Sequence, residues 1–139
     1  MKSDPIAAIL DKHNLRNTQT RRLVLQALSA GKKSFSPTDV REWINSRDSA
    51  INTVTVYRIL ERLMQLHIVH RHPCNGHFSL CSLPDTPGHH GFLHCTDCGT
   101  IEEFCDAKLC QVENAIAKKS GYRPSGHLSE IHGTCAECS

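Results

Sequence analysis

Cysteine and histidine are the residues of this sequence whose types and spacing can do chemistry. The chain of 139 residues contains eight Cys and ten His, and every Cys lies after residue 66. Four of the Cys form two Cys-x-x-Cys pairs, Cys95/Cys98 and Cys135/Cys138. Thiolates at this spacing converge from two tight turns on a tetrahedral Zn²⁺ ion. The sequence therefore predicts a structural four-cysteine zinc site whose binding energy also stabilises the fold.

Disulfide bonds are the alternative use of so many Cys, and they are typical of secreted chains. Residues 1–10 lack the apolar core of a signal peptide, and abundant His accompanies the Cys. We therefore expect reduced thiolates that bind metal in the cytoplasm. No stretch approaches the roughly 18–20 consecutive apolar residues of a membrane span, so no membrane partner is expected.

Charge divides the chain at nearly the same point as the Cys. Residues 1–72 contain twelve Lys or Arg against six Asp or Glu, whereas residues 73–139 contain four against eight. A basic half can be an ordinary solvated surface. It is also what a polyanion-binding face requires, because Lys and Arg gain affinity by releasing counterions from phosphates.

Helices are expected throughout the basic half. Asp4-Pro5 and Ser36-Pro37 each combine an N-cap residue with Pro at the first helical position, and a further helix is predicted to begin near Thr18. The segment 52–66 predicts a fourth helix, with three apolar residues at helical spacing on one face: Val56, Leu60 and Leu63.

The other side of segment 52–66 is polar and basic, with hydroxyl and guanidinium groups at Thr55, Tyr57 and Arg58. Such groups suit the major groove of DNA, although any surface helix can carry them. Two β-like runs, 67–73 and 77–82, then flank Asn75-Gly76, which is a strong hairpin signal. Helices followed by a hairpin predict a winged helix-turn-helix.

The sequence resembles the ferric uptake regulator family of bacterial metal-sensing repressors. The resemblance covers essentially the whole chain and is carried by residues 17–25 (NTQTRRLVL), 55–60 (TVYRIL), 94–99 (HCTDCG) and 135–138 (CAEC). It implies an α+β fold with a winged-helix DNA-binding domain at 1–82 and a small α/β dimerisation and metal-binding domain at 89–139. The Pro- and Gly-rich segment 83–88 between them reads as a hinge.

The zinc-sensing branch of the family is the most similar. It implies a regulatory zinc site made of His70, Cys81, His89 and Glu103, with His90 as the alternative to His89. A thiolate in such a set favours zinc over the harder Fe²⁺ or Mn²⁺. Taken singly, each residue can also be an exposed His, a small buried hydrophobe or a solvated carboxylate.

The resemblance also suggests an additional metal site, less strongly supported, at Cys110 and His127 with His90 or His89 nearby. One ligand position of that site falls on Gly91, which has no side chain to coordinate. The sequence assigns no metal role to Cys74 or Cys105, and packing is the default for Cys105.

The expected function is a zinc-responsive transcriptional repressor that binds palindromic operator DNA as a homodimer and controls zinc-uptake genes. The resemblance implies that Tyr57 lies near base edges and that Arg58 contacts phosphate or a purine. Thr55 and either Arg21 or Arg22 would support the backbone. Neither catalytic residues nor a small-molecule substrate are expected.

Three alternatives remain open at this level. A sensor of iron or peroxide would need a His- and Asp-rich site, against which Cys81 argues. A zinc-stabilised adaptor would bind protein and never read DNA, which leaves the basic half unexplained. A zinc deaminase would need a Pro-Cys-x-x-Cys unit, whereas Pro73-Cys74 is followed by Asn-Gly-His.

Overall fold

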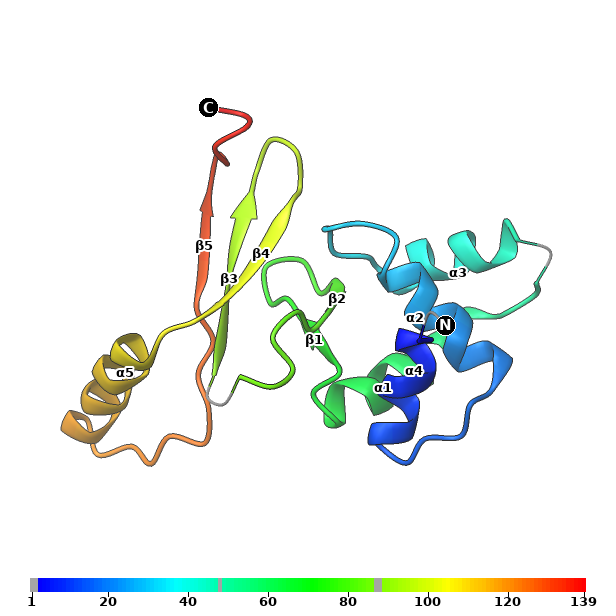
Figure 1. Ribbon diagram of the computed structural model, residues 1–139. Coiled ribbons are helices and arrows are strands. Elements are labelled where there is room, and N and C mark those ends of the chain that lie inside the picture. The colour runs from blue at the N-terminus through cyan, green and yellow to red at the C-terminus, as the bar shows by residue number, and fades with distance from the viewer. Residues whose placement is uncertain (1–2, 48, 87–88) are drawn as a thin grey trace. The chain divides into compact units, whose positions relative to one another are not determined.

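The computed structural model describes residues 3–47, 49–86 and 89–139 and divides the chain into two compact units. Unit 1 covers Met1–Cys81 and unit 2 covers Ser82–Ser139. Both contain helices and small sheets, so the predicted α+β class is confirmed (Figure 1). Pro87 and Gly88, part of the predicted hinge, lie outside the described residues. Every helix in the described ranges is too short or too polar to cross a bilayer.

Unit 1 begins with four short helices, which are coloured blue to green along the chain in Figure 1. They are α1 (Pro5–Lys12), α2 (Gln19–Leu28), α3 (Pro37–Asn45) and α4 (Thr53–Gln65). A polar side chain caps the first turn of each, from Asp4, Thr18, Ser36 and Asn52 in turn. The helix starts predicted from cap-plus-Pro signals are therefore confirmed, because these caps satisfy amides that have no partner within the helix.

The core of unit 1 forms where these helices pack on one another. The apolar stripe predicted on α4 supplies part of it, since Val56, Leu60 and Leu63 are at most 1% exposed. Val24 and Leu25 of α2 are fully buried in the same cluster. Burial of this stripe leaves the opposite side of α4 facing solvent.

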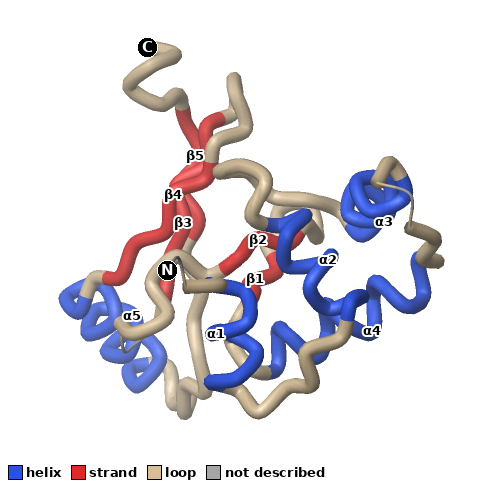
Figure 2. Tube along the Cα trace, turned by 45° about the vertical axis from the view of Figure 1, so that its right-hand side comes forward, coloured by secondary structure: helices blue, strands red, loops and turns tan. Residues whose placement is uncertain are grey.

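A hairpin follows α4 and forms the wing (Figure 2). Helix α4 ends in a Schellman motif, in which Ile68 N–H donates to the Leu63 carbonyl at 2.9 Å and His67 takes a left-handed φ of 59°. Strands β1 (Val69–Arg71) and β2 (Phe78–Leu80) then pair antiparallel.

The connection in this hairpin is longer than the predicted Asn75-Gly76 turn. The last cross-strand bond runs from His72 N–H to the His77 carbonyl, so four residues form the loop. Only Gly76 within it has a positive φ, of 71°. Pro73 has no N–H to extend the ladder, which explains why pairing stops one residue before it.

Unit 2 is a three-stranded sheet with one helix. Strands β3 (His90–Cys95), β4 (Ile101–Cys105) and β5 (Glu130–Gly133) have the order β4-β3-β5, with β3 antiparallel to β4 and parallel to β5. Helix α5 (Ala107–Lys119) connects β4 to the return segment, and none of its residues is buried in this single chain. The sheet register decides which potential ligands share a face.

Candidate metal centre and nucleic-acid interface

Four Cys side chains of unit 2 meet where β3 and β5 end. Cys95 closes β3, Cys98 lies in the following turn, and Cys135 and Cys138 follow β5. Their sulfur atoms lie within 4.8 Å of one another, and Cys98 Sγ is 3.8 Å from Cys135 Sγ. Thiolates about 2.3 Å from a tetrahedral zinc ion stand about 3.8 Å apart. The four side chains therefore fit a zinc ion.

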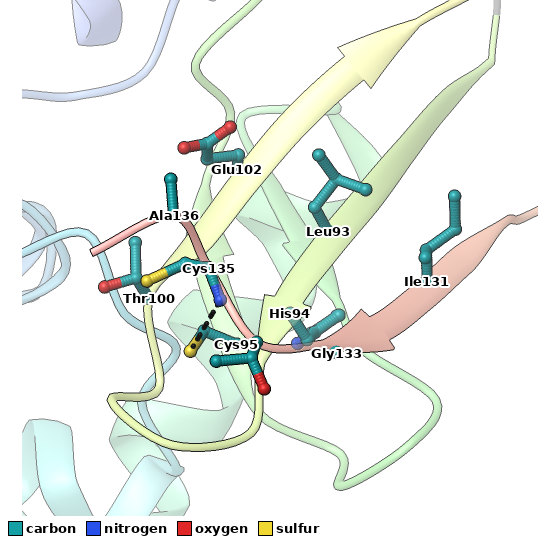
Figure 3. Close-up of a pocket in the computed structure, with 10 residues that line it drawn as sticks. Leu93, His94, Cys95, Thr100, Glu102, Ile131, Gly133, Cys135 and Ala136 are labelled. Atoms are coloured by element: carbon teal, nitrogen blue, oxygen red, sulfur yellow. Dashed lines mark hydrogen bonds between the residues drawn. The ribbon is translucent and has the colours of Figure 1, made fainter. Parts of the chain in front are cut away.

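Backbone amides donate hydrogen bonds to one sulfur of this cluster and favour its thiolate form, which is the form that binds a cation. The N–H groups of Cys98 and Cys135 donate to Cys95 Sγ at 3.5 and 3.3 Å, and Figure 3 shows the second bond as a dashed line. These bonds lower the pKa of Cys95 to about 6. Hydrogen bonds with the Cys135 and Cys98 sulfurs raise the pKa of Cys138 to about 12. Without metal the cluster thus retains protons that a cation must displace.

His90 and Glu103 face each other across β3 and β4. His90 Nδ1 contacts Glu103 Oε2, and both side chains are nearly buried, at 9% and 4% exposed. Ser82 N–H donates to the other carboxylate oxygen of Glu103 at 3.0 Å, and His90 Nε2 lies 3.0 Å from the Thr86 carbonyl. Of the two His considered for the regulatory site, His90 is the one that meets Glu103.

The other two residues expected in that site lie together in unit 1. His70 is in β1, and Cys81 directly follows β2, where its N–H donates to the Ile68 carbonyl at 2.9 Å. A ring nitrogen of His70 lies within 4.8 Å of Cys81 Sγ. Each unit therefore contributes one pair of candidate ligands, and the four-residue site itself stays a prediction.

His89 belongs to a different group, with Cys110 and His127. One ligand atom from each lies within 4.8 Å of the others, and the two imidazole rings are 4.3 Å apart. His127 Nδ1 also contacts Glu113 Oε2. The structure thus gathers the expected Cys110 and His127 around His89, and His90 lies in the pair with Glu103.

Gly91 explains why this group lacks a further ligand. A Cβ atom added there would stand 2.4 Å from the ring of Phe104, which faces Gly91 on the neighbouring strand. An Asp or His at this position would require the ring to move. The group of His89, Cys110 and His127 therefore differs from the additional site that the resemblance suggests. It has no ligand at position 91, and the ring of Phe104 occupies the space that a side chain there would need.

The outer side of α4 is the candidate nucleic-acid surface. Thr55 donates from its N–H and hydroxyl to the Asn52 cap at 2.8 and 3.0 Å, which fixes the first turn. Tyr57 is 45% exposed, and Arg58 beside it is also exposed. Val54, in the first turn of α4, is 60% exposed and lies on the same side as these two residues, three and four positions before them. These side chains are free to meet a groove.

The two Arg of α2 differ in their surroundings. Arg22 Nη2 forms an ion pair with Asp4 at 2.7 Å, whereas Arg21 Nη1 donates to the Arg16 carbonyl at 3.0 Å. Arg21 is thus the one whose charge is not paired with a carboxylate in these contacts. The predicted backbone role of either residue stays a prediction.

Sequence reasoning did not single out Val54, Ser82 or Glu113. Glu113 follows Cys110 by three residues on α5, a spacing that puts both on one helix face and could have identified it. Ser82 reaches Glu103 only through the fold, so no local signal was available. Cys74 is exposed at the hairpin and Cys105 is half-buried in β4.

Known proteins resemble this chain over nearly its whole length. The model of the ferric uptake regulator family matches residues 12–132. A ferric uptake regulation protein of Haemophilus influenzae is 32% identical over 93% of this chain and 88% of its own length. The zinc uptake regulation protein of Escherichia coli is 29% identical over 94% of this chain and 77% of its own length.

Solved structures give the same result. A zinc uptake regulator complexed with zinc and DNA has a TM-score of 0.85 at 28% identity, covering 95% of this chain and 89% of that chain. The ferric uptake regulator of Helicobacter pylori has a TM-score of 0.60 at 25% identity, covering 96% and 89%.

A winged helix joined to a unit with a four-cysteine centre, in a chain with these relatives, defines a metal-responsive DNA-binding regulator. The chain belongs to the ferric uptake regulator family of transcriptional regulators, and its fold is similar to solved structures of zinc uptake regulators.

Proposed function

We propose that this chain is a zinc-responsive transcriptional repressor. It binds palindromic operator DNA as a homodimer when a regulatory zinc site is filled, and it controls zinc-uptake genes. Two ligand pairs carry the proposal: His70 with Cys81 in unit 1, and His90 with Glu103 in unit 2. Two imidazoles, a thiolate and a carboxylate make a four-coordinate set suited to zinc.

The proposed site draws its ligands from both sides of the predicted hinge. Zinc, when bound, would supply a common positive centre for all four side chains. His70 and Cys81 would then restrict the wing, and with it α4, relative to the unit that carries His90 and Glu103. Any such restriction couples zinc affinity to DNA affinity reciprocally, typically by about 1–3 kcal/mol.

The structural zinc site would have a separate task. Cys95 and Cys98 follow β3, and Cys135 and Cys138 follow β5, so a shared ion would fasten these two parallel strands at one end. Its ligands are all thiolates, which favours tight and permanent binding. We therefore assign the structural role to this cluster and the regulatory role to the mixed set.

Unit 2 supports the proposed homodimer through its exposed apolar side chains. Val112 and Ile116 on α5 are 56% and 62% exposed, and Ile131 on β5 is 56% exposed. A helix that buries none of its residues gains little from its own chain. We infer that a second copy covers α5, which would also bring two α4 helices to the half-sites of a palindrome.

An iron sensor is the second candidate, because a ferric uptake regulation protein is 32% identical to this chain over 130 aligned residues. Cys81 argues against it, since a thiolate is a softer ligand than Fe²⁺ sites usually contain. Competition between Zn²⁺ and Fe²⁺ in a DNA-binding assay separates the two. Fe²⁺ that supported tighter operator binding than Zn²⁺ would favour the iron sensor.

Native mass spectrometry of the intact protein at buffered free-zinc concentrations tests the proposal. We expect a tight step from the four-cysteine site and at least one weaker step that a Cys81→Ser variant lacks. Cys105→Ser is the matched control, because Cys105 belongs to neither set and to no other group of potential ligands among the described residues. A single tight step in every variant would contradict the regulatory site.

A further inference from the structure

A second group of histidine and carboxylate ligands shares a sheet face with His90 and Glu103. The register pairs His94 of β3 directly with His132 of β5, and Phe92 with Glu130. Side chains alternate along a strand, so His94, His132 and Glu130 lie on one face, as do His90 and Phe92. Phe92 is fully buried and stands between His90 and His94 along β3. The two groups are therefore separate.

Two histidines of this second group meet one carboxylate. His94 Nε2 lies 3.6 Å from Glu130 Oε1, and His132 Nε2 lies 3.6 Å from Glu130 Oε2. Ligands about 2.0–2.2 Å from a tetrahedral zinc ion stand about 3.4 Å apart. The His94 and His132 rings are stacked, with centroids 5.0 Å apart and planes 21° apart, so both present their nitrogens to the same carboxylate.

We propose that His94, Glu130 and His132 form an additional binding site for a divalent first-row transition metal ion. Two imidazoles and a carboxylate leave at least one coordination position open to water, as in zinc sites with three protein ligands. No cysteine of unit 2 belongs to this group, unlike the four-cysteine cluster and the set that includes Cys110. It should therefore accept Zn²⁺, Co²⁺ or Ni²⁺ with less selectivity.

The location gives this site a structural consequence. His94 immediately precedes Cys95, and His132 lies three residues before Cys135. An ion held by both would link β3 to β5 directly below the two turns that carry the four Cys. Occupancy should therefore slow exchange of the backbone amides that join these two strands, such as Thr96 N–H to the Gly133 carbonyl at 2.8 Å.

An ion pair is the simpler explanation of the same contacts. Glu130 is 13% exposed and can accept hydrogen bonds from both rings without any metal. That alternative predicts no ion lost when either ring is replaced. The experiment must therefore count ions and report the type of ligand.

Counting ions comes first, in the full-length protein titrated with buffered Zn²⁺ and followed by native mass spectrometry. His132→Gln is the principal variant, because His132 is 45% exposed and its replacement should leave the fold intact. We expect it, and Glu130→Gln, to lose one ion per chain while the tightest step remains. His13→Gln, at the C-cap of α1, is the matched control and should lose none. Equal ion counts in all variants would overturn the proposal.

Cobalt spectra identify the ligand type of the ion that is lost. With the thiolate-containing sites already filled by Zn²⁺, added Co²⁺ should give visible d–d bands without a thiolate-to-cobalt charge-transfer band. The His132→Gln variant should lose these bands. A charge-transfer band on the same ion would mean that a Cys holds it, and the assignment to His94, Glu130 and His132 would be wrong.

Discussion

His90 Nδ1 contacts Glu103 Oε2 across strands β3 and β4, whereas the neighbouring His89 packs its ring against His127. His89, just before β3, and His90, at its start, therefore belong to different groups. The register pairs Phe92 with Glu103, which makes His90 a diagonal neighbour of that carboxylate on the same face. We therefore take His90, rather than His89, as the histidine ligand of the proposed regulatory site.

The first prediction compares these two His residues. His90→Ala should abolish the zinc dependence of operator binding, because it removes one of the four proposed regulatory ligands. His89→Ala is the matched control and should retain that dependence, although it can lose the ion proposed at Cys110 and His127. Fluorescence anisotropy at buffered free zinc measures both. The reverse pattern would assign the regulatory role to His89.

The second prediction concerns the four-cysteine cluster. Cys135→Ser should remove the tightest zinc ion and destabilise unit 2, because metal binding there contributes directly to folding. Zinc content and hydrogen exchange of β3 and β5 report the two effects. Unit 1 has its own core and should keep its protection. A variant that still retained its tightest ion would contradict the cluster's assignment.

Zinc binding to the same cluster should release protons at pH 7. Cys95, with a pKa of about 6, is already mostly ionised there, whereas Cys138, with a pKa of about 12, carries a proton that zinc must displace. Affinity should consequently rise with pH, and calorimetry in buffers of different ionisation enthalpy counts the protons. Binding that released no protons at pH 7 would contradict the raised pKa of Cys138.

The third prediction tests the outer face of α4. Arg58→Ala should weaken operator binding by about 1–3 kcal/mol, or roughly 5- to 150-fold, and leave the zinc count unchanged. Arg123→Ala removes the same charge from unit 2, outside the winged-helix unit, and serves as control. Equal loss in both variants would indicate a general charge effect, and no loss at Arg58 would exclude it from the interface.

The fourth prediction addresses the homodimer. Val112→Glu or Ile116→Glu places a carboxylate on the exposed apolar side of α5 and should shift the protein to monomer in sedimentation velocity experiments, because a charge cannot be buried there without a partner. Gln111→Glu adds the same charge at a neighbouring polar position and should remain dimeric. A dimer that survived both apolar substitutions would place the interface elsewhere.

The fifth prediction is a pH dependence in unit 1. Hydrogen bonding from Ala7 N–H and from Arg22 lowers the pKa of Asp4 below its usual 3.8. Because the pKa of Asp4 is lower in the folded than in the unfolded state, its contribution to stability is fully present above the unfolded pKa of 3.8. The contribution is lost as the pH falls through the folded-state pKa. Asp4→Asn should therefore lower stability at pH 7 and converge with the parent in acid.

Fluorescence of Trp43 in α3 follows this unfolding, because the sequence contains one Trp. Asp11→Asn, at the exposed end of α1, is the control and should leave stability nearly unchanged at every pH. If the loss of stability caused by Asp4→Asn grew as the pH fell, the pKa of Asp4 would not be lowered by folding, which would contradict this prediction.

Local signals allowed the helices of unit 1 to be predicted from sequence. Asp4 and Ser36 cap their helices through bonds to amides two or three residues away. The start of each helix and the interaction that causes it therefore lie within one short segment of sequence. The buried stripe of α4 follows in the same way from helical spacing. The hairpin was predicted too, but its loop length was not, because Pro73 sets where pairing stops.

The metal groups depended on information that the sequence carries only indirectly. The spacing within the two Cys-x-x-Cys pairs is enough to predict that their four thiolates converge on one metal ion. The choice between His89 and His90, in contrast, depends on strand register, and one residue of slip would reverse it. Likewise, Glu130 meets His94 only because β5 pairs parallel to β3, and no short motif connects these two residues, which lie 36 positions apart in the sequence.

Operator binding measured against buffered free zinc, for the parent protein and for Cys81→Ser, tests the central claim most directly. The account predicts that the parent binds tightly only once a second zinc step is filled. It predicts that Cys81→Ser retains its four-cysteine zinc yet binds weakly at every zinc concentration. Zinc-dependent binding that was unchanged in Cys81→Ser, or tight binding by the parent with only the four-cysteine site filled, would contradict it.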